Sequence, residues 1–310
     1  VAGGAHCASS PARMTTLMLL CLGVAVFLQI AANFANDYSD GIRGTDAHRA
    51  AAAVANRVEY VTRATGPGDV EREETLDYEE LHAPTRLVAS GVPPRAVLTA
   101  AAVNAALACA CGLAAVVITG YWWLLAVGAL CVLAGWFYVG GAHPYGYRGW
   151  GEIAAFVFFG PVATLGTTVT MAGAVEWPTV CASLVIGLVA LAVLSVNNLR
   201  DIRSDAQAGK RTWTVRLGAH ATTVCIIVVI ALVMLAVLAA GVYVGVHGFT
   251  LAHLTAGWGF CAVLGMVCVL LTGYFTCFEV ARGEYMRAMW SLALLALWFA
   301  LAFTGFAMVL

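Results

Sequence analysis

The sequence predicts an all-α polytopic membrane protein, and three observations support that prediction. Of its 310 residues, 62% are hydrophobic and only 11% are charged, whereas a soluble globular protein carries about 25% charged residues. The mean hydropathy is +0.87. The apolar residues gather in runs that are long enough to cross a bilayer. Together with a net charge of −1, these values exclude a disordered chain, a nucleic-acid-binding protein and an ordinary cytosolic enzyme.

Eight apolar runs of about 20 residues predict the spanning helices. They lie near residues 14–36, 95–118, 121–139, 151–173, 178–199, 222–246, 252–278 and 287–310. A further apolar stretch, from Val1 to Ala8, is too short to span. Because the chain also begins with Val rather than Met, we expect it to lack most of a first helix. The ten cysteines lie almost wholly inside apolar runs without any Cys-x-x-Cys spacing, so we expect buried thiols rather than disulfides or a zinc site.

The distribution of Lys and Arg predicts the orientation of the chain. The loops after the first, third, fifth and seventh visible helices, with the adjoining helix ends, hold 15 of the 16 Lys and Arg residues; the exception is Arg13. Such a bias marks the cytoplasmic face. Both long polar loops, 37–94 and 198–220, are therefore expected to be cytoplasmic in a multi-pass protein of the cell membrane.

One polar segment interrupts an otherwise single transmembrane domain that spans residues 1–310. Residues 50–83 are polar, with their acidic residues clustered in 69–80. We expect a solvated cytoplasmic insertion there.

Two clusters of Asn and Asp carry the chemical signal, each at the cytoplasmic end of an apolar run. The first reads NFANDYSDGIRGTD and the second NNLRDIRSDAQAGK; they span residues 33–46 and 197–210. On a helix, Asp37 and Asp40 share a face, as do Asp201 and Asp205. Carboxylates this close raise one another's pKa unless a cation lies between them. Since Mg²⁺ prefers oxygen ligands and often combines carboxylates with substrate phosphates, the two pairs predict two metal ions around a diphosphate.

Basic and aromatic residues accompany these clusters. Arg200 and Lys210 belong to the second cluster, and Arg86 follows the first in the segment RLVASG. Their side chains are suited to phosphate oxygens. A third polar loop, PYGYRGWGE, spans residues 144–152. In that loop Tyr147 and Trp150 are typical of interfacial aromatic residues, and Glu152 is typical of a carboxylate at the start of a helix.

These motifs resemble the UbiA-type intramembrane prenyltransferases, and the resemblance extends from about residue 14 to 310. The most specific segments are NFANDYSDGIRGTD, RLVASG, PYGYRGWGE, FFGPVATLGT and NNLRDIRSDAQAGKRTWTVRLG. Within that superfamily the chain most resembles the branch that prenylates 1,4-dihydroxy-2-naphthoate in the menaquinone pathway.

The resemblance implies a bundle of about nine transmembrane helices around a central cavity, of which eight are complete here. It also implies transfer of a polyprenyl group from polyprenyl diphosphate to 1,4-dihydroxy-2-naphthoate, with decarboxylation to demethylmenaquinol. The catalytic residues would be Asp37, Asp40, Asp201 and Asp205, which would bind Mg²⁺. The expected substrate-binding residues are Asn33, Asn36, Asp46, Arg86, Tyr145, Asn197, Asn198, Arg200 and Lys210.

The chain departs from the family in one loop, and two alternative functions remain open. About 30 extra residues separate the first cluster from RLVASG, whereas the family has a short loop that lies over the site. An acceptor other than the naphthoate, such as 4-hydroxybenzoate, would leave the two Asp clusters unchanged. A membrane transporter that uses intramembrane acidic residues is a different class of protein, but it would place them near the bilayer midplane.

Overall fold

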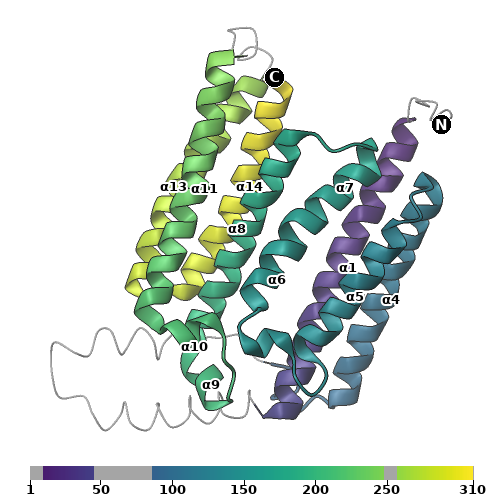
Figure 1. Ribbon diagram of the computed structural model, residues 1–310, viewed down its shortest axis with the longest axis vertical. Helices are drawn as coiled ribbons and strands as arrows, with labels where there is room; N and C mark the ends of the chain where they lie inside the picture. Colours follow the sequence, from purple (N-terminus) through teal and green to yellow (C-terminus); the bar gives the residue numbers. More distant parts are fainter. Residues whose placement is uncertain (1–9, 45–85, 248–256, 310) are drawn as a thin grey trace, which may run out of the picture.

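The computed structural model describes residues 10–44, 86–247 and 257–309, and within these ranges helices predominate and no strand occurs. Eight apolar helical segments run roughly parallel or antiparallel to one another along the long axis (Figure 1). Consecutive segments alternate in direction, so the start of α1 and the end of α14 lie at the same end of the bundle (Figure 1). The predicted all-α polytopic architecture is confirmed.

The eight segments correspond to the eight predicted runs. They are α1 (Pro11–Arg43), α4 (Pro94–Thr119), α5 (Leu124–Val139), the continuous unit α6–η2–α7 (Gly151–Val157, Phe158–Val162 and Ala163–Ala172), α8 (Trp177–Arg200), α11 (Ala219–His247), α13 (Trp258–Arg282) and α14 (Tyr285–Val309). Seven of them are long and apolar enough to span a membrane, and α5 has 16 residues. A helix before α1 stays a prediction, because residues 1–9 lie outside the described ranges, as does the expected insertion at 50–83.

Helix α1 extends beyond its apolar run and includes the first Asp cluster. It begins with Ser10 as its N-cap and Pro11 in its first turn, where a missing N–H costs nothing. It ends at Gly44, which has a φ of 76° and closes the helix in the left-handed conformation. The acidic residues at 37 and 40 are therefore held on a helix rather than on a loop.

The main core surrounds α8. Side chains of α8, α11, α13 and α14 form one apolar cluster, whose fully buried members include Val196, Leu199, Ile226, Val269 and Leu295.

The nine described cysteines do not belong to this buried core. All nine have free thiols, and each is partly or fully exposed at the surface of the bundle. The expectation of buried thiols was wrong, because helices in a membrane also expose apolar positions to lipid.

Close backbone contacts fix the middle of the bundle. A Cβ on Gly160, in η2, would lie 2.5 Å from the Cα of Gly187 and 2.6 Å from the carbonyl oxygen of Ser183, both on α8. Pro161 follows directly, and the chain forms a π-helical turn there because proline lacks the N–H for a regular ladder. Because Gly160 has no side chain, α8 can approach the α6–η2–α7 unit closely.

Short helices gather at the polar end of the bundle. They are η1 (Tyr145–Arg148), α9 (Ile202–Gln207) and α10 (Trp213–Leu217), and α9 and α10 lie below the main bundle in Figure 1. Thr212 caps α10, because its hydroxyl accepts a hydrogen bond from the N–H of Val215 at 3.3 Å. The N–H of Arg211 donates to the carbonyl of Tyr147 at 2.8 Å. This bond joins the loop after α5 to the loop after α9, beside both Asp clusters.

Candidate active site

The last turns of α1 bury three polar side chains. Asp37, Ser39 and Asp40 are 6%, 3% and 1% exposed. The Oδ2 of Asp37 accepts a hydrogen bond from the N–H of Leu87 at 2.9 Å, and its Oδ1 accepts one from the N–H of Val88 at 3.3 Å. Asp37 therefore fastens the RLVASG turn to the end of α1.

The second cluster is held by an internal ion pair. Arg200 and Asp201, at the end of α8, are both 4% exposed. The guanidinium contacts both carboxylate oxygens, with Nε to Oδ1 at 2.9 Å and Nη2 to Oδ2 at 3.0 Å. It also donates to the Oδ1 of Asn197 at 2.8 Å. This two-pronged geometry fixes the Asp201 carboxylate where the helix ends.

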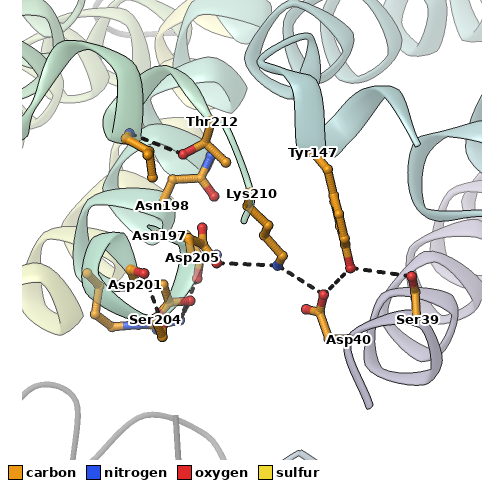
Figure 2. Close-up of polar contacts among 12 residues, drawn as sticks. Ser39, Asp40, Tyr147, Asn197, Asn198, Asp201, Ser204, Asp205, Lys210 and Thr212 are labelled. Carbon is orange, nitrogen blue, oxygen red and sulfur yellow. Dashed lines mark hydrogen bonds and ion pairs between the residues drawn. The ribbon is translucent and has the colours of Figure 1, made fainter. Parts of the chain in front are cut away.

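Lys210 connects the two clusters. Its ammonium lies 2.9 Å from the Oδ1 of Asp40 and 3.3 Å from the Oδ1 of Asp205. Figure 2 shows the lysine side chain extended between the end of α1 and the α9 segment. Lys210 is 8% exposed and Asp205 is 3% exposed, so solvent screens these pairs weakly. The structure thus brings together one aspartate from each predicted cluster.

An aromatic residue completes the contact on the α1 side. The hydroxyl of Tyr147 donates to the Oδ1 of Asp40, and it lies 3.3 Å from the hydroxyl of Ser39 (Figure 2). The Lys210 ammonium lies 4.7 Å from the centroid of the Tyr147 ring, within the range of a cation–π contact. Ser39 donates in turn to the carbonyl of Val139 at 2.8 Å, which fixes the end of α5 against α1.

Burial and charge shift three pKa values at this site. Burial raises the pKa of Asp205 to about 6; Lys210 opposes the shift, whereas Asp201 and Asp40 add to it. Burial alone would lower the pKa of Lys210, but the carboxylates of Asp40 and Asp205 raise it above its ordinary value. Burial, together with the charge of Asp40, raises the pKa of Tyr147 to about 12. At neutral pH the lysine is therefore charged and the tyrosine keeps its proton.

The donor set allows a test of the expected magnesium site. Among the described residues, no three His, Cys, Asp or Glu side chains form a ready-made metal site. Asp40 and Asp205 nevertheless already enclose one cation, the Lys210 ammonium. In addition, the Oδ2 of Asp40 is buried without a hydrogen-bond partner in the described part of the chain. Because Mg²⁺ commonly takes one or two carboxylates and completes its shell with phosphates and water, the residues fit a metal that arrives with a diphosphate.

The other expected site residues lie in different surroundings. Asn33 is exposed and Asn36 half-buried on α1. Arg86 is half-buried just before the turn that Asp37 holds. The hydroxyl of Tyr145 donates to the carbonyl of Ala134 at 2.9 Å, which places it in packing beside α5. Asp46 lies outside the described residues.

Asn198 leads to a residue whose role the sequence did not indicate. Its Nδ2 donates to the Oε1 of Glu152 at 2.9 Å. Glu152 is 0% exposed, and its Oε2 has no hydrogen-bond partner among the described residues. The position of Glu152 at the start of α6 suggested a helix-terminal charge, but the side chain points into the bundle. Tyr147 and Ser39 were missed as site residues for the same reason: only the tertiary fold brings them to Asp40.

Comparison with known proteins gives a family and several relatives. The profile of the UbiA prenyltransferase family matches residues 1–278. A protein of Mycobacterium tuberculosis named 1,4-dihydroxy-2-naphthoate octaprenyltransferase is 43% identical over 219 residues, which is 70% of this chain and 64% of that protein. Proteins with the same name from Mycobacterium leprae and Escherichia coli are 44% and 33% identical, each over 64% of this chain and 57% of their own length. No solved structure matches the chain.

Proposed function

The chain belongs to the UbiA prenyltransferase family, and from this premise we propose that it transfers a polyprenyl group from polyprenyl diphosphate to 1,4-dihydroxy-2-naphthoate. The carboxylate of the ring would leave as CO₂, which gives demethylmenaquinol. The names of the relatives at 43–44% identity support this acceptor. The chain spans less than two thirds of the length of those two relatives. The observation on which the proposal rests is the Lys210 link between the two Asp clusters.

The site is suited to a diphosphate leaving group. Asp40 and Asp205 would hold Mg²⁺, with Asp37 and Asp201 as the further ligands that the motifs predict. When bound, the metal supplies positive charge to the leaving diphosphate. The Lys210 ammonium supplies a second positive charge from the protein, and Arg86 and Arg200 stand at the edges of the two clusters. Preorganised charge of this kind stabilises the anion that develops as the C–O bond of the donor breaks.

The apolar helices provide the other requirement of the reaction. The allylic chain carries positive charge while the bond breaks, so water must be kept from it until the aromatic ring attacks. The site lies at the end of a bundle whose helices are almost purely apolar beyond their terminal turns. We place the polyprenyl chain along these helices and the diphosphate among the polar side chains at their ends.

The location of the site leads to a proposal for its orientation. Both Asp clusters and 15 of the 16 Lys and Arg residues belong to the same set of loops and helix ends. Under the positive-inside rule, the site faces the cytoplasm of a multi-pass protein in the plasma membrane. Charged donor head groups and the aromatic acid would then reach it from the cytoplasm.

A membrane assay tests the proposed function. Membranes that contain the protein, Mg²⁺ and polyprenyl diphosphate are given either 1,4-dihydroxy-2-naphthoate or 4-hydroxybenzoate, and the lipid product is identified by its mass. We expect a prenylated, decarboxylated product with the naphthoate alone. A product with 4-hydroxybenzoate alone would contradict the proposal that 1,4-dihydroxy-2-naphthoate is the acceptor. The Asp205→Asn variant serves as the control for background activity of the host membrane.

A further inference from the structure

A pocket of about 820 Å³ lies beside the site, between two loops at the polar end of the bundle. Residues 142–150 line one side and residues 208–216 the other. The bond from the N–H of Arg211 to the carbonyl of Tyr147 joins the two sides. Gly149 has a φ of 85°, and a Cβ there would lie 3.1 Å from the carbonyl oxygen of Arg211. The wall is therefore built by close backbone packing, and its volume is typical of small-molecule sites.

The pocket is strongly basic. Four guanidinium groups line it, from Arg43, Arg148, Arg211 and Arg216, and no carboxylate does so among the described lining residues. Arg216 donates to the carbonyls of Arg148 at 2.6 Å and Arg211 at 3.0 Å. Arg43 donates to the carbonyl of Gly141 at 2.8 Å. These carbonyls orient the guanidinium groups of Arg216 and Arg43 without neutralising their charge, so the pocket favours an anion.

The remaining walls favour an aromatic anion. The rings of Tyr147, Trp150 and Trp213 line the same pocket, and flat rings and guanidinium planes both stack on aromatic ligands. Asp40 and Asp205 do not line it. A diphosphate that travels with Mg²⁺ needs such carboxylates, whereas a carboxylate ligand needs only the arginines. This difference argues that the ligand of the pocket is an aromatic acid rather than the diphosphate donor.

Tyr147 connects the pocket to the site. The same residue that lines the pocket donates its hydroxyl hydrogen to Asp40 and faces Lys210 with its ring. A ligand in the pocket would therefore lie one side chain away from the contact between the two Asp clusters.

We propose that this pocket receives the aromatic acceptor and recognises its ring carboxylate before prenyl transfer. Arg148 and Arg211 bind the carboxylate, and Trp150 and Trp213 hold the ring. The inference rests on the proposed function for the identity of the acid. Contacts to the carboxylate form when the acceptor binds and persist while the prenyl group is transferred, so they stabilise the bound substrate and the transition state of transfer alike. Losing them should therefore raise the KM for the acceptor and leave kcat largely unchanged.

Kinetics with two acceptors test the role of the arginines. The variant Arg148→Gln/Arg211→Gln is compared with the wild type on 1,4-dihydroxy-2-naphthoate and on 1,4-dihydroxynaphthalene, which lacks the carboxylate. We expect the KM for the carboxylated acceptor to rise about tenfold or more, as loss of charge-assisted hydrogen bonds predicts. The KM values for the other acceptor and for the donor should change less than twofold. Arg95→Gln, an exposed residue at the start of α4 outside the pocket, is the matched control.

A substitution in the aromatic wall gives a second test. Trp150 is 59% exposed, so Trp150→Leu should leave the fold intact. It should raise the KM for both acceptors, because it removes a contact with the ring rather than with the carboxylate. A rise in the KM for the donor in either variant would identify a diphosphate site instead and overturn the proposal.

Binding without reaction separates this inference from the proposed function. Equilibrium dialysis of purified protein with 1,4-dihydroxy-2-naphthoate under anaerobic conditions and without donor should show binding that the double arginine variant weakens about tenfold. Prenyl transfer combined with unchanged binding in the variant would overturn the pocket and leave the function standing. Binding by the wild type that the variant weakens, combined with no transferase activity in the wild type, would support the pocket and overturn the proposed function.

Discussion

At the scale of single residues, the Lys210 ammonium lies between two carboxylates from distant parts of the chain. Asp40 comes from α1 and Asp205 from α9, 165 residues later in the chain. Asp37 and Asp201, the other members of the two pairs, are bound instead by the Leu87 and Val88 amides and by Arg200. The four aspartates therefore divide into two whose carboxylates contact backbone amides or Arg200 and two that share the Lys210 ammonium. Their spacing in the sequence predicts the pairs but not this division.

The Tyr147 hydroxyl is the first residue-scale test. Tyr147→Phe keeps the ring over Lys210 but removes the hydrogen bond to the buried Asp40. Leaving a buried charged acceptor with one partner fewer costs about 1–3 kcal/mol. We expect a lower melting temperature in detergent and a several-fold lower kcat/KM for the donor. Tyr274→Phe, which changes a 64% exposed tyrosine on α13, should alter neither measurement.

Protonation of Asp205 gives a second test at this scale. Its pKa rises from 3.8 in the unfolded chain to about 6 in the fold, chiefly through burial. A raised pKa means that the folded state binds the proton more tightly, so this stabilisation is complete below pH 3.8 and is lost as the pH rises to about 6. Lys210 and Tyr147 keep their protons throughout that window.

The measurement is thermal unfolding in detergent with EDTA between pH 4 and pH 7. We expect the wild type to lose stability relative to Asp205→Asn as the pH rises through this range, because asparagine does not titrate. A constant difference between the two proteins would show that Asp205 does not titrate as its burial predicts.

At the scale of elements, the hydropathy pattern predicts the helices well and their ends less well. Each of the eight apolar runs contains a helix in the described part of the chain, yet α1 continues seven residues past its predicted end at 36, to Arg43. Polar side chains do not stop a helix when partners such as the Leu87 and Val88 amides satisfy them. The π-helical turn at Phe158–Val162 was not predicted, because hydropathy does not distinguish it from regular helix. The turn depends on how closely α8 approaches Gly160.

Two glycines in the same spanning unit test that approach. Gly160→Ala would place a Cβ 2.5 Å from the backbone of α8, and overpacking of this kind costs about 1–3 kcal/mol. Gly166→Ala meets nothing within 4 Å and should be neutral or stabilising by up to about 1 kcal/mol. The measurement is the melting temperature of each variant in detergent. Equal stability of the two variants would mean that α8 is not held by this contact.

At the scale of the whole molecule, the polar features gather at one end. The Asp clusters, the basic pocket and the short helices α9 and α10 all lie where α1, α5 and α8 end. The sequence predicts this end from its charges, but the pocket joins loops about 60 residues apart. The hydrogen bonds from Arg211 to Tyr147 and from Arg216 to Arg148, with the packing at Gly149, show that these loops meet.

Labelling from each side of the membrane tests the orientation. In a cysteine-free background, Gln207→Cys places a thiol on α9 and Ala174→Cys places one in the exposed turn after α7, at the opposite end. A membrane-impermeant maleimide should label position 207 only in inside-out vesicles and position 174 only in right-side-out vesicles. The reverse pattern would place the site on the outer face of the membrane.

The most direct test of the central claim is the steady-state kinetics of Lys210→Gln, with each substrate varied in turn. If the two Asp clusters and Lys210 together bind the diphosphate, the KM for polyprenyl diphosphate should rise at least tenfold, in line with the loss of a buried charged contact. The KM for the naphthoate should stay within twofold, and Lys210→Arg, which keeps the charge, should recover part of the loss. An unchanged KM for the donor, or a rise confined to the acceptor, would contradict the account.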